Sequence, residues 1–587
     1  MAHRHTFTRR DFLKLSGAGV AGATLACSVG SKAVELTAVP PPLGSAAPHM
    51  APLAPGEIAD AVFYNGNVVT MDAGRSRAKA LAVKDGLIRL VGDEQTVRAS
   101  AGQGTQLVDL RGRTVTPGLI DAHCHLSMCG LLGTVYVDIN WPAVSTLQEV
   151  QARVSERIAA TPLGEWVVGS GWVSFDGRYP NKHDLDPFSP KHPVMLINQG
   201  GHMAVVNSRA LEIAGVNAST KDPVNGRIER EAGGEPSGLI MNHPALDLFR
   251  KLWPPEMFDL AAMEASVLHP QAKFASYGVT SFQDVYARDM DRVQAYLNLA
   301  RRGQMTLRGQ IMSVLEYFQE LEGRIDNLEA VRFENDYMHL AGGKFQLDGV
   351  LELSFTNQPH NGLAWNVSIW KADELNQCVR AFHDAGYQVA LHAIGDAAVD
   401  MGLDAIEAAM NANPRPDPRH RIEHSILNSD SALQRTRDLG VVISTQPQAI
   451  RMFADALDGI WGSERTRRIV PTRTWLDMGV PLALSSDAPS MPWWDPQTTL
   501  LASVLRLSAS NKLVSPEQAL TIEEAMYAHT MGGAYANFDE GRKGSLEPGK
   551  FADLIVWHDD PFSVATKEIV DLTVDLTVVG GKVAYTV

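Results

Sequence analysis

The feature that most constrains the fold is a repeated alternation of short apolar segments with helical patterns in the middle of the chain. The apolar segments lie at residues 114–126, 278–285, 306–313, 342–349, 387–393, 420–425, 441–447 and 481–489. Most of them are separated by helical patterns such as DAAVDMGLDAIEAAM. Eight strands connected in this way predict an α/β fold in which parallel strands close into a (β/α)8 TIM barrel.

The spacing of these segments also predicts the domain organisation. The first strand is followed by a gap of about 150 residues, which is much longer than one crossover connection. We therefore expect the barrel at residues 118–535 and an inserted subdomain at about 130–265. Residues 57–113 and the last 45 or so are short, alternating and punctuated by turns. These patterns predict that residues 46–117 and 536–587 form two halves of one small β-sandwich.

The first 45 residues have the composition of a targeting segment. Arg9 and Arg10 are followed by Phe12-Leu13-Lys14 and by a weakly apolar stretch rich in Gly and Ala. This order resembles a twin-arginine export signal, which predicts a periplasmic or secreted protein. The alternative is a chance arginine pair before an apolar helix. The Pro-rich segment that continues to about residue 56 is typical of a disordered linker.

The overall composition excludes several classes of protein. The formal net charge is −15 and the sequence pI is about 5.6, so nucleic acid is not an expected partner. The 587 residues contain no internal apolar run of the roughly 20 residues that span a bilayer. Four cysteines without CxxC spacing do not indicate a disulfide scaffold. A small molecule is the expected partner, and the sequence leaves the oligomeric state open, a homodimer included.

Two histidines lie one residue apart at the end of the first barrel strand. In a strand, residues i and i+2 point to the same side, so His123 and His125 reach one point while Cys124 points away. Two neutral imidazoles that converge in this way suit an ion such as Zn²⁺. The alternative is a pair of polar residues that satisfy hydrogen bonds at a strand end.

Other barrel strands also end in a residue that could bind metal or act as a base. These residues are Lys344 on the fourth strand, His392 on the fifth, His424 on the sixth and Asp487 on the eighth. His392 and His424 are 32 residues apart, about one β/α repeat, so neighbouring strands would present them side by side. Chemistry in such barrels is located at the carboxyl ends of the strands. A single histidine there is usually structural, but the ordered set predicts a metal site.

These segments also carry a family resemblance. PGLIDAHCHL, LHAIGDAAVD, RIEHS and LSSDAP, with the closing GSLEPGKFADLIVWHDDP, resemble the amidohydrolase superfamily. GGHMAVVNSRALE and GKFQLDG point within it to the YtcJ-like group, amidohydrolase family 3, which includes N-substituted formamide deformylases. The resemblance extends over residues 57–587 or nearly so.

The resemblance implies a zinc-dependent hydrolase of carbon–nitrogen bonds other than peptide bonds. The implied ligands of one or two Zn²⁺ ions, or of other divalent metals, are His123, His125, His392, His424 and Asp487. It also implies that Lys344 is carboxylated and bridges two metals, because a carbamate is an anionic ligand whereas an ammonium is repelled. The alternative for Lys344 is a salt-bridging lysine.

The implied mechanism is attack by a metal-activated hydroxide on an amide carbonyl, with Asp487 as the proton shuttle. The same site would serve a carbamate, a cyclic imide, an ester or an amino-heterocycle. A catalytically silent binding or regulatory protein is the non-enzyme alternative.

The substrate pocket is predicted from fewer signals. His202, within the expected insertion, could approach the substrate carbonyl or could be a structural hydrogen-bonding residue. Trp172, Trp493 and Trp494 could line the pocket mouth, although tryptophan serves more often in packing. An aromatic pocket would favour an apolar or aromatic amide.

Overall fold

The computed structural model describes residues 53, 56–175, 177–350, 353–360 and 368–587. Its centre is one parallel sheet of eight strands, in the order β21-β20-β19-β18-β17-β16-β15-β8. The strands are β8 (Leu119–Cys124), β15 (Val279–Ala287), β16 (Arg308–Leu315), β17 (Met338–Gln346), β18 (Gln388–Ala393), β19 (Arg421–His424), β20 (Val442–Thr445) and β21 (Leu482–Leu484). All eight lie within or overlap the predicted segments, so the predicted α/β barrel is confirmed.

The ring closes beyond the last residue of β21. The Asp487 backbone N–H donates to the His123 carbonyl oxygen at 2.8 Å, and the His125 N–H donates to the Ala488 carbonyl oxygen at 2.7 Å. Asp121 on β8 accepts a further bond from the Ser486 backbone N–H at 2.9 Å. These bonds join the first strand to the segment after the last strand, at the end of the barrel where the histidines lie.

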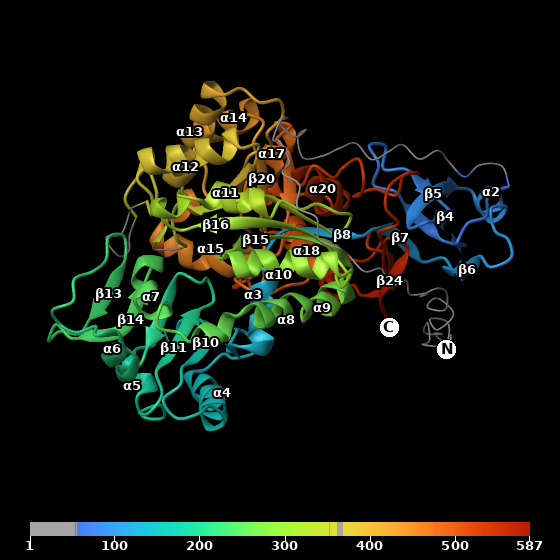
Figure 1. The fold of residues 1–587 in the computed structure, drawn as a ribbon. Coiled ribbons are helices and arrows are strands. Elements are labelled where there is room, and N and C mark those ends of the chain that lie inside the picture. The colour runs from blue at the N-terminus through green and yellow to red at the C-terminus, as the bar shows by residue number, and fades with distance from the viewer. Residues whose placement is uncertain (1–52, 54–55, 176, 351–352, 361–367) are drawn as a thin grey trace, which may run out of the picture.

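Helices surround the barrel because their apolar faces pack against the strands (Figure 1). In α12 (Ala372–Asp384), for example, Leu375, Val379 and Phe382 recur at helical spacing and are buried. The other helices of the barrel part are α9 (Gln271–Ser276), α10 (Met290–Arg301), α11 (Arg324–Ala330), α13 (Asp396–Ala412), α14 (Asp430–Asp438), α15 (Ala449–Ile460), α16 (Ser463–Thr466), α17 (Thr472–Asp477), α18 (Pro496–Leu505), α19 (Ile522–Tyr527) and α20 (Gly533–Ala536).

A second, mixed sheet is inserted between β8 and β15, in the order β13-β14-β12-β11-β10-β9. Its strands are β9 (Val137–Asp138), β10 (Val167–Trp172), β11 (Val194–Asn198), β12 (Met203–Val206), β13 (Arg227–Arg230) and β14 (Pro236–Met241). The helices of this segment are α3 (Leu126–Thr134), α4 (Leu147–Ala160), α5 (Lys182–Leu185), α6 (Ser208–Ala214), α7 (His243–Arg250) and α8 (Leu260–Leu268). The sheet has apolar clusters of its own on its two faces.

The two ends of the described chain meet in one sheet. It has the order β24-β23-β22-β7-β2-β3, and β22 (Leu554–Trp557) pairs antiparallel with β7 (Thr114–Pro117). The other strands are β2 (Asn67–Val69), β3 (Arg77–Ala78), β23 (Val574–Val579) and β24 (Lys582–Thr586). A four-stranded sheet of β5 (Leu87–Gly92), β4 (Ala80–Lys84), β1 (Ala61–Tyr64) and β6 (Gln106–Asp109), with α2 (Glu94–Arg98), packs beside it.

The inserted sheet and the terminal sheets lie on opposite sides of the barrel (Figure 1). Among the described residues, no helix combines the length and the apolar character required to cross a membrane. The predicted export signal at residues 1–45 lies outside the described residues, as does almost all of the predicted linker.

Candidate active site

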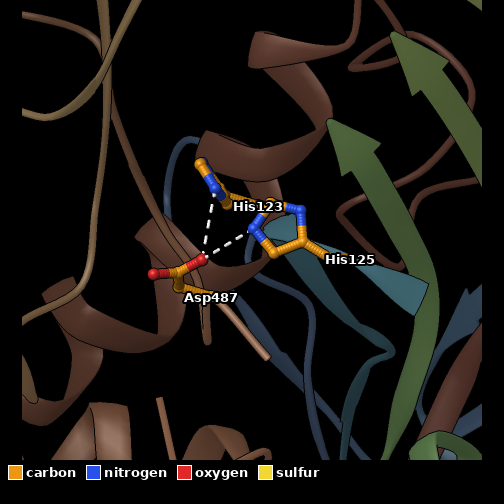
Figure 2. A group of neighbouring side chains, drawn as sticks. All are labelled: His123, His125 and Asp487. Atoms are coloured by element: carbon orange, nitrogen blue, oxygen red, sulfur yellow. Dashed lines mark ion pairs between the residues drawn. The ribbon is translucent and has the colours of Figure 1, made fainter. Parts of the chain in front are cut away.

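His123, His125 and Asp487, all predicted site residues, meet at the end of the barrel where the segment after β21 contacts the end of β8. One Asp487 carboxylate oxygen, Oδ1, lies 3.4 Å from His123 Nε2 and 3.0 Å from His125 Nε2 (Figure 2). One potential ligand atom of His123, one of His125 and one of Asp487 all lie within 4.8 Å of one another. All three side chains are buried. The ring closure described above produces this group, because it places the segment after β21 against the end of β8.

The other predicted ligands surround the same small cavity of about 40 Å³, which we call the inner cavity. Its lining includes His123, His125, His202, Lys344, His392, His424 and Asp487. The imidazole rings form a continuous row: His123 lies 4.7 Å from His424, His424 lies 4.5 Å from His392, and His392 lies 5.5 Å from His202, between ring centroids. The structure therefore brings together every histidine that was predicted for the site.

A hydrogen bond from Nδ1 sets the orientation of two of these imidazole rings, those of His123 and His424. His123 donates its Nδ1–H to Glu423 at 2.6 Å, and His424 donates its Nδ1–H to the Gln446 side-chain oxygen at 2.7 Å. A histidine that donates from Nδ1 is left with a free electron pair on Nε2, which is the form that binds a metal. Glu423 is in turn held by Arg421, whose Nε lies 2.7 Å from the carboxylate.

The backbone at two of these positions is unusual. His424 and Asp487 have φ values of 70° and 54°, in the left-handed region that residues other than glycine seldom adopt. Such conformations persist where the surrounding structure enforces them, and they concentrate at functional sites.

Burial controls the charge of the site. It lowers the pKa of His202 and of His424 to about 3 and also lowers the pKa of His125 and His392, so these rings are neutral near pH 7. Burial alone would raise the pKa of Asp487, but the contacts with His123 and His125 hold it well below its ordinary value. Burial also lowers the pKa of Lys344 to about 8, so part of this amine is neutral at physiological pH.

These properties fit a bound metal ion. His123 Nε2 and His392 Nε2 are buried and have no hydrogen-bond partner within the described part of the chain, and both rings line the inner cavity. Buried polar atoms are normally satisfied, so their convergence on one cavity requires an explanation. Neutral imidazoles and an ionised carboxylate form the donor set that Zn²⁺ prefers.

A larger cavity of about 440 Å³, which we call the outer cavity, opens beside the inner one. The two share His125, Gly200, Gln346 and Ser490. The outer cavity lies between the barrel and the inserted segment, since Trp253 and Tyr136 come from the insertion, Tyr286 lies near the end of β15 and Arg288 follows that strand. The Tyr286 ring packs edge-on against His125, with 5.5 Å between ring centroids.

The predicted tryptophans line neither of the two cavities, as far as the described residues define them. Trp172 is buried in the insertion and donates its indole N–H to the Leu196 carbonyl oxygen at 2.6 Å. Trp493 packs edge-on against Trp141, and Lys273 lies over the ring of Trp494. Their positions in the sequence therefore do not predict that these tryptophans line the substrate cavity. Each indole packs against other side chains instead.

Sequence reasoning also missed residues that the structure places at the site. Glu423 and Asp121 had a usable signal, because each lies two residues from another site or network residue on the same strand face: Glu423 from Arg421, and Asp121 from His123. His243 and Arg250 gave no such signal, because they come from the insertion and line the outer cavity only through its docking on the barrel.

The model of the amidohydrolase family matches residues 106–585. This chain belongs to the amidohydrolase family.

Its relatives and structural neighbours extend over most of the chain. An N-substituted formamide deformylase from Arthrobacter pascens is 29% identical over 90% of this chain and 99% of its own length. Protein LONG AFTER FAR-RED 3 from Arabidopsis thaliana is 31% identical over 90% of this chain and 92% of its own. The crystal structure of an uncharacterized metal-dependent hydrolase from Pyrococcus horikoshii has a TM-score of 0.69 and 25% identity, over 86% of this chain and 99% of that one. Family membership makes this chain a hydrolase.

Proposed function

We propose that this amidohydrolase-family protein is a zinc-dependent hydrolase that cleaves the carbon–nitrogen bond of an apolar or aromatic amide, of the N-substituted formamide kind. The observation that carries the proposal is the convergence of His123, His125 and Asp487, with unsatisfied buried atoms, on the inner cavity. The name of the Arthrobacter pascens relative supports the substrate class.

The residues that would hold one or two divalent ions are His123, His125, His392, His424 and Asp487. A zinc ion bound there would supply a water whose pKa is near 7 and would polarise a carbonyl oxygen. The neutral His202 ring lines the same cavity and would donate its N–H to the substrate carbonyl oxygen.

Asp487 would move the proton in this reaction. Its carboxylate oxygen accepts the proton of the attacking water and then donates it to the departing nitrogen. This transfer is indispensable for an amide, because an amine leaves poorly as an anion.

We further propose that Lys344 carries a carboxyl group on Nζ. The residue is 1% exposed on β17 and lines the inner cavity, and its lowered pKa supplies the neutral amine that reacts with carbon dioxide. Mass spectrometry under non-denaturing conditions tests for the adduct. A fully metallated and active Lys344→Ala variant would contradict a bridging role.

Metal removal tests the central proposal. The chelated protein should lose hydrolysis of N-benzylformamide, and Zn²⁺ should restore it, with metal content measured by elemental analysis. Full activity in a verified metal-free preparation would refute the metal mechanism.

The export proposal concerns the residues outside the described range. We propose that Arg9 and Arg10 direct twin-arginine export, so that replacing both with lysine retains the protein in the cytoplasm. Normal periplasmic recovery of the double variant would remove this assignment.

A further inference from the structure

The outer cavity has an excess of positive charge among its described lining residues. Four basic side chains line it, and only two acidic ones do. The basic residues are Arg250, Lys251, Arg288 and Arg292, and the acidic residues are Asp247 and Asp289.

Most of the negative charge near this wall is already paired. Arg288 Nη2 lies 2.9 Å from Asp247 and 2.6 Å from Glu316, which lies just behind the lining. Arg250 makes a longer contact of 3.4 Å with the same Asp247 oxygen. Asp289 caps α10, because it accepts a bond from the Arg292 backbone N–H at 2.7 Å. The carboxylates of Asp247 and Glu316 therefore pair with Arg288 and Arg250, and that of Asp289 caps a helix.

Arg292 is left with a charge that no acidic group neutralises. Its side chain is buried, with 5% of the residue exposed, and it has no ion pair in the described part of the chain. Nη1 makes one hydrogen bond of 3.3 Å to the Tyr286 carbonyl oxygen, and the buried Nε has no partner among the described residues. A buried guanidinium without an anion is energetically costly, so a ligand with negative charge would relieve this cost.

The other cations line the same cavity. Burial raises the pKa of the Tyr136 hydroxyl, while Arg292, Arg250 and Arg288 act in the opposite direction. The three guanidinium groups thus act on one hydroxyl in the outer cavity wall, and Asp289 is the carboxylate that opposes them there. Lys251 is exposed at the rim.

An aromatic surface lies beside these cations. Tyr136, Trp253 and Phe258 line the cavity and pack on one another, with ring centroids 5.4 to 6.4 Å apart. A ligand that satisfies both walls has an apolar or aromatic body and an anionic group. The volume of about 440 Å³ is in the range of small-molecule sites.

We propose that the outer cavity binds a carboxylate, or a similar oxyanion, of the amide substrate, with Arg292 as its main partner and Arg250 and Lys251 in support. This specificity site rests on the proposed amide hydrolysis in the inner cavity. Arg292 binds the part of the substrate that does not react, so the preferred substrates are amides whose aromatic portion also carries a negative charge.

A matched pair of substrates tests this proposal. N-formylphenylalanine and N-formylphenethylamine differ only in one carboxylate. The wild-type enzyme should favour the carboxylate by roughly 10- to 100-fold in kcat/KM, the range expected for hydrogen bonds to a charged group. Arg292→Met should bring the ratio close to one, whereas Arg301→Met, which removes an exposed cation from the other end of α10, should leave it unchanged. Equal kcat/KM values in the wild type, or an unchanged ratio in Arg292→Met, would overturn the proposal.

Calorimetry separates this proposal from the function on which it rests. If neither amide is hydrolysed, the proposed reaction is wrong, but binding still tests the outer cavity. The protein should bind 3-phenylpropionate more tightly than 3-phenylpropan-1-ol, and Arg292→Lys should retain part of the difference. Equal binding of the acid and the alcohol would overturn the proposal, as would inorganic phosphate binding as tightly as 3-phenylpropionate, because the cavity would then be a site for free anions.

If Arg292→Met does not fold, the rim residue provides the test. Lys251→Met should lower the preference for the carboxylate by roughly 2- to 5-fold, because an exposed charge contributes less. An unchanged preference in that variant, together with equal binding of acid and alcohol by the wild type, would contradict the assignment.

Discussion

The inner and outer cavities adjoin, yet they are built from different parts of the chain. The inner cavity is lined largely by residues at the ends of barrel strands. Burial keeps four of its histidines, His125, His202, His392 and His424, neutral, and hydrogen bonds from Nδ1 orient His123 and His424. The outer cavity is lined largely by the insertion, by the end of β15 and by the segment after it, and it contains guanidinium groups and aromatic rings. The difference indicates a division of labour. The barrel supplies the reactive groups, and the insertion supplies the surface that selects the substrate.

The largest expected effect comes from the inner cavity. Asp487→Asn keeps the shape of the side chain but removes the basic oxygen, so amide hydrolysis should fall by about 10²- to 10⁴-fold. Esters should lose less, because an alkoxide leaves more easily than an amine anion. Assays of one amide and its matched ester, with metal content measured in parallel, check this expectation. Equal losses at full metal occupancy would remove the shuttle role.

A smaller effect should follow from the residue that orients a histidine. Glu423→Gln weakens the hold on His123 Nδ1, and outer-shell changes of this kind typically lower metal affinity or activity by about 10- to 100-fold. Zinc titration monitored by calorimetry measures the affinity. Glu540→Gln is the matched control, since that carboxylate pairs with Arg419 and lines neither cavity. Equal effects of the two changes would indicate a general loss of stability.

The outer cavity should influence binding more than chemistry. Trp253→Leu removes an aromatic contact, so KM for N-benzylformamide should rise by about 2- to 10-fold while kcat stays nearly constant. N-methylformamide, which lacks the ring, should be unaffected. Trp493→Leu is the control because Trp493 lines neither cavity. A larger KM change in the control would reverse the roles of the two tryptophans.

The smallest effect concerns two buried histidines outside both cavities. They show how a neutral buried imidazole changes the pH dependence of stability where no metal is expected to bind. His420 Nε2 and His383 Nδ1 lie 2.8 Å apart, and His383 Nε2 lies 2.7 Å from the Asn413 carbonyl oxygen. Burial lowers the pKa of both rings below 6.5, so both imidazoles are neutral in the folded protein near pH 7. Their contribution to stability is complete above the unfolded pKa and is lost as the pH falls below it.

Each such histidine should add a slope of up to about 1.4 kcal/mol per pH unit to the free energy of unfolding below pH 6.5. His420→Gln should reduce this slope, measured by urea unfolding at about pH 7.5 and about pH 5.5. The exposed Asn411, which has no titratable side chain, provides the control, since Asn411→Gln should leave the slope unchanged. A slope unaffected by either substitution would mean that His420 titrates equally in the folded and unfolded chain.

The barrel could be predicted because its signals are local. Alternation in a strand and helical periodicity are properties of neighbouring residues, and eight such segments in order leave few architectures. The same local rule predicted that His123, on β8, and His125, directly after that strand, reach one point, and both rings lie against Asp487. It could not place Trp172, Trp493 and Trp494, since an indole follows the nearest available packing surface, and the sequence does not reveal where that surface lies.

The sequence by itself therefore determined which strands present His123, His125, Lys344, His392, His424 and Asp487, because strand ends are set by local pattern. Only the tertiary structure decided that Asp487 lies against the first two histidines, since that contact requires closure of a ring whose ends are more than 350 residues apart in sequence. It also decided that Glu423 orients His123 across 300 residues. The outer cavity depends most on tertiary structure. Arg250 and Arg292 come from different elements, and only the docking of the insertion on the barrel brings their charges together around one space.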